Sequence, residues 1–135
     1  MSVVTPKQME QILRNLFNGG MLERLPKNRR HAEALLALAA ASLDSQSEFT
    51  EPELNSILGD WLADFADPVF LDHVTVRRYL VDLGMLLRDA EGSRYRTNQP
   101  VIGRIIEAST RSVNPRVVYQ AVQAERALRR RQVRE

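Results

Sequence analysis

The chain has 135 residues, none of which is cysteine, and only two are histidine. The absence of cysteine excludes disulfide bonds, thiolate nucleophiles and every zinc site that uses sulfur ligands. With only His31 and His73, the chain offers few ligands for a metal site built on histidine. We therefore expect neither a metal nor a cofactor.

Long apolar runs and a secretory signal are also missing. No apolar stretch approaches the roughly 18 residues that a membrane span needs. Residues 1–11 do not have a charged region followed by an apolar one, as a signal peptide would. Hydrophobic residues make up 44% and charged residues 27% of the chain, which is typical of a globular protein. We expect a soluble, cytoplasmic protein with no membrane segment.

Charge is distributed unevenly along the chain. Residues 1–100 carry 11 basic and 14 acidic groups, a net charge of −3, whereas residues 101–135 carry 8 and 3, a net charge of +5. A basic tail on a slightly acidic body indicates a polyanionic or acidic partner. We divide the chain accordingly into a domain of residues 1–100 and a C-terminal helical extension of residues 101–135.

Helix start signals recur along the chain. Thr5 with Gln8, and Thr50 with Glu53, have the spacing of capping boxes, and a proline follows each threonine within two residues. Single N-cap residues open three further helices: Asn28, Asp72 and Asn114. Together with the spacing of the apolar residues, these signals predict helices over residues 5–18, 28–42, 50–66, 72–83, 101–111 and 114–131.

The pattern changes after residue 83. Gly84 suits the left-handed end of a helix, residues 85–87 form a short apolar run, and residues 94–97 alternate after a turn at 89–92. These features predict a β-hairpin. We predict a mainly α fold with a small β-hairpin, namely a winged helix-turn-helix with a C-terminal helical extension. Residues 50–66 and 72–83 would form the helix-turn-helix and the hairpin the wing.

Three stretches of sequence resemble the bacterial family known as domain of unknown function 2087. They are residues 49–58 (FTEPELNSIL), 76–88 (VRRYLVDLGMLLR) and 92–95 (GSRY). The family patterns are aromatic-Thr-Glu-x-Glu-Val-Asn-x-x-Leu, Leu-Arg-Arg-x-Leu-Val-Asp and Gly-Ser-x-Tyr. Residues 22–26 (LERLP) resemble a further family motif. The resemblance covers about residues 10–96 and leaves the chain after Pro100 outside.

The chain departs from the family pattern in two places. Pro52 and Leu54 replace the usual lysine and valine, and the spacer at residues 60–72 is longer than usual. The family occurs alone and fused to winged-helix repressors, so the resemblance implies an association with transcription but no biochemical activity.

Candidate nucleic-acid-binding residues come from three segments. Arginine grips phosphates or reads guanine through paired hydrogen bonds, a role that suits the predicted recognition helix and the hairpin. The alternative for the first pair is that one of the two arginines, Arg77 or Arg78, pairs with the nearby acidic run or with Asp82. For Arg94 and Arg96 it is a solvated face of the hairpin with Asp89 and Glu91 as partners, and for the C-terminal arginines it is a frayed, solvated terminus. The densest basic cluster spans residues 126–134. The candidates are His73, Thr75, Arg77, Arg78, Arg94, Arg96, Arg129, Arg130 and Arg131.

Residues 44–72 carry eight acidic groups and no basic one. Such a surface beside a recognition helix would repel DNA and favour a basic partner. We predict a DNA-binding transcriptional regulator that contacts double-stranded DNA. The alternative is a winged-helix protein-interaction module that docks a basic partner through residues 44–72. We expect no enzyme, because the sequence has no Gly-rich phosphate loop, no GxSxG and no HExxH motif.

The C-terminal extension carries two apolar stripes. Residues 101–111 and 114–131 both have apolar residues at helical spacing, which a domain of residues 1–100 does not need for its own core. These stripes predict a homodimer built mainly by residues 101–128. The alternative is that the helices fold back and enlarge the core of the monomer.

Overall fold

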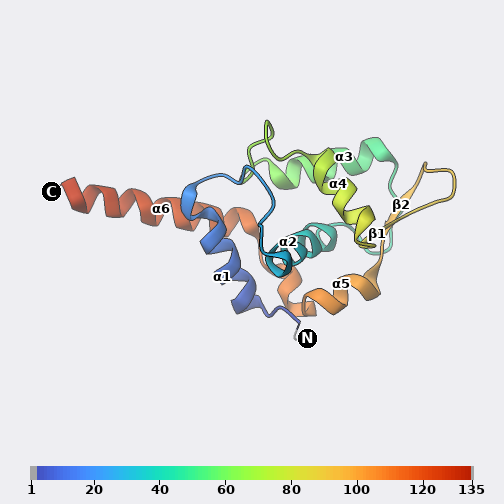
Figure 1. The fold of residues 1–135 in the computed structure, drawn as a ribbon, viewed down its shortest axis with the longest axis horizontal. Helices are drawn as coiled ribbons and strands as arrows, with labels where there is room; N and C mark the ends of the chain where they lie inside the picture. The colour runs from blue at the N-terminus through green and yellow to red at the C-terminus, as the bar shows by residue number, and fades with distance from the viewer. Residues whose placement is uncertain (1–2, 135) are drawn as a thin grey trace.

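A computed structural model describes residues 3–134 of the chain. The fold is mainly helical, with one small antiparallel sheet of two strands, which confirms the predicted class (Figure 1). The elements, with 3-10 helices written η, are α1 (Pro6–Leu16), η1 (Phe17–Gly19), α2 (Arg29–Ala41), α3 (Glu51–Leu62), α4 (His73–Asp82), β1 (Leu86–Arg88), β2 (Tyr95–Thr97), α5 (Gln99–Ile105), η2 (Ala108–Ser112) and α6 (Pro115–Arg134).

Both predicted capping boxes are confirmed. The backbone N–H of Gln8 donates to the Thr5 hydroxyl at 3.2 Å, and the backbone N–H of Thr5 donates to the Gln8 side chain at 3.0 Å. Thr50 and Glu53 make the same pair of bonds at 3.3 and 2.9 Å. These bonds satisfy backbone donors that the first turn of a helix leaves unpaired, and they account for where α1 and α3 begin.

Two predicted helices are shorter than expected. The helix predicted over residues 50–66 ends at Leu62, because the chain turns there to pair with Leu22, whose backbone N–H donates to the Phe65 carbonyl at 2.9 Å. Residues 63–72 therefore join α3 to α4. The helix predicted over 101–111 ends at Ile105, and Ile106 instead pairs with Val4 in a parallel bridge.

The helix α2 occupies the centre of the fold. Residues 34–40 form an uninterrupted buried run of alanine and leucine. A helix that is apolar on all sides must be covered on all sides, and α4, α5 and η2 pack against α2. The small alanine side chains allow these neighbours to approach closely.

The hairpin is held against the body by a third short segment. β1 and β2 pair in antiparallel register, with Leu87 opposite Arg96. Phe49, which lies between α2 and α3, forms an isolated antiparallel bridge to Tyr95 through two backbone hydrogen bonds of 2.8 Å. Gly84 adopts a φ of 76°, the left-handed conformation predicted for the turn from α4 into β1.

The first and last long helices of the chain, α1 and α6, pack on each other. α6 lies beside α1, and Arg14 of α1 pairs with Glu125 of α6 at 3.0 Å (Figure 1). The Thr110 hydroxyl, fully buried, donates to the Val4 carbonyl at 2.8 Å. Beyond the Arg14–Glu125 ion pair, α6 projects away from the body. Although α6 has 20 residues, no helix within residues 3–134 is both long and apolar enough to span a membrane.

Four of the apolar residues in the predicted dimer segment are buried within the monomer. Ile102, Ile106, Val118 and Val122 all belong to the hydrophobic core, with exposed fractions of 8% or less. In this respect the helices fold back onto the body. Val117 and Leu128 remain 55% and 56% exposed, so the surface left for a second copy is the outer face of α6.

Candidate nucleic-acid interface

Arg77 joins α4 to α3. Its guanidinium forms an ion pair with the Glu51 carboxylate at 3.0 Å and donates a hydrogen bond to Oδ1 of Asn55. Only 18% of the Arg77 side chain is exposed. Both partners lie in the stretch 49–58 that carries the family resemblance. The first arginine of the Arg-Arg pair therefore holds two helices together and is not free to grip a phosphate.

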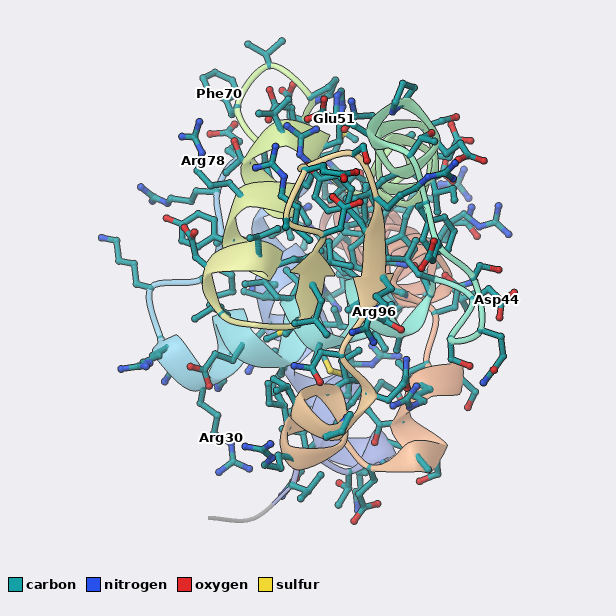
Figure 2. All side chains as sticks on the ribbon, turned by 90° about the vertical axis from the view of Figure 1, so that its right-hand side faces the viewer. Arg30, Asp44, Glu51, Phe70, Arg78 and Arg96 are labelled. Carbon is teal, nitrogen blue, oxygen red and sulfur yellow. The ribbon has the colours of Figure 1, made fainter. Side chains whose placement is uncertain are left out.

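Arg78 has the opposite environment. It lies on the outer face of α4, is exposed, and stands at the edge of the molecule (Figure 2). Among residues 3–134 its side chain has no hydrogen-bond or ion-pair partner. Of the two adjacent arginines in this motif, Arg77 therefore has a structural role and the Arg78 side chain is free.

His73 and Thr75 lie at the start of α4 and are both half-buried. His73 packs near Gly59 of α3, where a Cβ atom would lie 3.8 Å from Nδ1 of His73. The backbone N–H and the hydroxyl of Thr75 each donate to Oδ1 of Asp72 at 2.9 Å. Thr75 is therefore the hydrogen-bond donor to Asp72, the N-cap residue of α4.

The cap bonds also affect the titration of Asp72. Hydrogen bonds from the backbone and side chain of Thr75 hold the pKa of Asp72 below its ordinary value of 3.8. Because the folded-state pKa is lowered, the stabilisation is fully present above pH 3.8 and is lost as the pH falls through the folded-state value.

The hairpin presents two exposed arginines. The side chains of Arg94 and Arg96 have no ion-pair or hydrogen-bond partner in the part of the chain that the structure describes, and Arg96 lies on the face shown in Figure 2. Arg88 instead lies over the Tyr95 ring, 5.6 Å from its centroid. The pKa of Glu53 is lowered mainly by hydrogen bonds with Thr50 and also by the charge of Arg94, so the hairpin has an acidic neighbour.

The C-terminal arginines lie far from this surface. Arg129, Arg130 and Arg131 are exposed on the projecting end of α6. That end and the hairpin occupy opposite ends of the long axis of the molecule (Figure 1). The α6 cluster is therefore separate from the arginines of the hairpin.

Several carboxylates of residues 44–72 are engaged in local bonds. Asp44 accepts from the backbone N–H of Gln46 at 3.1 Å and from the Ser47 hydroxyl at 2.7 Å, which lowers its pKa. Asp67 accepts from the backbone N–H of Val69 at 3.0 Å. Glu51, Glu53 and Asp72 bond as described above. Four of the eight carboxylates of this segment thus serve as cap or turn acceptors, and Glu51 and Asp64 form ion pairs with Arg77 and Arg116.

Sequence reasoning missed an exposed apolar patch beside Arg78. Val69 is 81%, Phe70 62%, Val74 38% and Tyr79 47% exposed. We call these residues the α4 patch. The signal for Val69 and Phe70 was available, because they follow Asp67-Pro68 in the long spacer, outside any helical pattern. Val74 and Tyr79 lie next to the buried positions of α4, so the sequence pattern alone does not show that their side chains are exposed.

Comparison with known proteins identifies the family. The model of a family described as uncharacterized proteins conserved in bacteria, DUF2087, matches residues 21–97. No curated protein and no solved structure matches the chain. The matched segment runs from the turn before α2 to the end of β2 and covers more than half of the chain. The chain therefore belongs to the DUF2087 family of uncharacterized bacterial proteins.

Proposed function

We propose that this protein is a winged-helix DNA-binding protein that acts in transcription. The order of elements supports the proposal. Helix α2 is followed by the short paired segment at Phe49, then α3 and α4, then β1 and β2. α4 would be the recognition helix and the hairpin the wing.

The observation that carries the proposal is the free arginine on α4. Arg78 is exposed and unpartnered within the described residues, while Arg77 is held by α3. Arg94 and Arg96 on the hairpin are exposed as well, and Arg96 lies on the face shown in Figure 2. Phosphate contacts need charge and reach, and these side chains supply both.

Replacing Arg78 with alanine should weaken binding to a mixed-sequence duplex. A phosphate contact contributes close to one unit to the slope of log affinity against log salt. We therefore expect Arg78→Ala to lower this slope by about one and to reduce affinity at low salt by about tenfold. Fluorescence anisotropy with a labelled duplex across a salt series measures both quantities.

The matched control is Arg104→Ala, which removes an exposed arginine from α5 without touching α4 or the hairpin. It should leave the slope unchanged. Absence of duplex binding by the natural chain at low salt, or equal effects of the two substitutions, would contradict the proposal.

We also propose that the protein forms a homodimer through the outer face of α6. Val117, Ala121, Ala124 and Leu128 follow the four-three-four spacing of a coiled-coil seam. Val117 and Leu128 are 55% and 56% exposed. A symmetric dimer would present two copies of α4 to one duplex.

Leu128→Glu should convert the dimer to a monomer, because it places a charge within the proposed apolar seam. Val133→Glu is the control, since Val133 is 88% exposed and lies off the seam. Analytical ultracentrifugation at high micromolar concentration measures the mass. A natural chain that is already monomeric under these conditions rules out the dimer.

A further inference from the structure

A cavity of about 390 Å³ lies between α2 and α4. The segment before α2 and the link between α3 and α4 form its other walls. Its volume is within the range of sites that hold small molecules, roughly 300–1,000 Å³. All of its lining residues lie between Arg24 and Leu83, inside the segment that matches the family.

The walls of the cavity are mainly apolar. Leu36 and Leu71 are 2% exposed and line it as part of the core. Phe70 and Tyr79 of the α4 patch also line it, yet they remain largely exposed. The cavity therefore opens to solvent past two aromatic rings that an apolar ligand would cover.

The charges at the cavity leave one arginine uncompensated. The charged residues of the lining are Arg24, Arg29 and Glu33. Arg29 forms an ion pair with Glu33 at 3.0 Å. Arg24 is exposed and has no hydrogen bond or ion pair with any residue that the structure describes. The cavity therefore combines an apolar interior with a net positive charge.

The local field adds to this charge. The first turn of α2 contains no acidic residue, so the positive end of the helix dipole is not compensated by its own side chains. A carboxylate bound beside Arg24 would form charge-assisted hydrogen bonds, while its apolar part would displace water from the leucine and aromatic walls.

From the cavity, its apolar walls and the unpaired Arg24, we infer that this protein binds a small monocarboxylic acid with an apolar body. The carboxylate contacts Arg24, and the body lies against Leu36, Leu71 and Phe70. Thr75, Tyr79 and Leu83 place one wall of the site on α4, the helix that carries Arg78. Binding is measured without DNA, so its outcome is independent of the proposed function.

A set of three probes with one body and different head groups tests the inference. 4-Phenylbutyrate, 4-phenylbutanol and 4-phenylbutylammonium are titrated into the full chain, and backbone amide shifts are followed by NMR. The carboxylate should produce saturable shifts in residues 24–36 and 70–83. The alcohol should bind about tenfold more weakly because it lacks the charge, and the ammonium more weakly still.

Two variants and a control locate the site. Arg24→Gln should reduce the affinity for the carboxylate to that for the alcohol, and should leave the alcohol unaffected. Ala32→Phe should abolish binding of both, because Ala32 lines the cavity and a ring there fills it. Arg104→Gln should change nothing. Equal affinities for the three probes, shifts confined to other residues, or full carboxylate affinity in Arg24→Gln would each overturn the inference.

Discussion

A chain truncated after Pro100 is expected to lose cooperative folding. The truncation removes Ile102, Ile106, Val118 and Val122, which are all buried. Burial of one aliphatic side chain contributes about 2 kcal/mol, so losing four approaches the entire stability of a typical domain, about 5–15 kcal/mol. Thermal unfolding followed by far-UV circular dichroism should show a broad, weak transition in place of a sharp one.

A second truncation provides the control. A chain that ends after Ala127 loses only the projecting end of α6 and keeps both buried valines and the Arg14–Glu125 ion pair. It should unfold within a few degrees of the full chain. A sharp transition in the shorter fragment would show that residues 1–100 fold independently of the C-terminal helices.

Arg77→Ala should destabilise the protein, whereas Arg78→Ala should not. Removing Arg77 leaves Asn55 and Glu51 without their partner at the α3–α4 contact. Glu51 is half-exposed, so the ion pair itself contributes little. The lost hydrogen bond and packing should cost about 1–2 kcal/mol, which lowers the melting temperature by about 3–10 °C.

Urea unfolding of the two variants measures this difference. Arg78→Ala should remain within about 0.5 kcal/mol of the natural chain, as exposed substitutions usually do. Arg77→Lys keeps the charge but not the paired donors of the guanidinium, and should recover only part of the loss. Equal destabilisation by Arg77→Ala and Arg78→Ala would contradict the division of roles between the two arginines.

Local features of the fold could be predicted from the sequence because they depend on residues three or four positions apart. The capping boxes at Thr5 and Thr50 are of this kind, and so is the glycine turn at Gly84. Each satisfies backbone groups within one turn. Hydrophobic spacing placed α1, α2 and α4 for the same reason.

Features that depend on distant residues could not be predicted. The sequence allowed an ion pair between one arginine of the motif and the acidic run, but it did not indicate that Arg77 would form it with Glu51 or would also bond to Asn55, 22 positions away. The end of α3 at Leu62 is set by the pairing of the following residues with Leu22, which no local pattern encodes. The cavity beside Arg24 arises where four segments meet, so its residues carry no common motif.

The pairing of Val4 with Ile106 has a consequence for synthesis of the chain on the ribosome. Val4 is translated about a hundred positions before its bonding partners Ile105, Glu107 and Thr110. Contacts of such high sequence separation slow folding, because a long loop must close before they form. The helix α1 must therefore wait, with its apolar face uncovered, until these later residues have been translated.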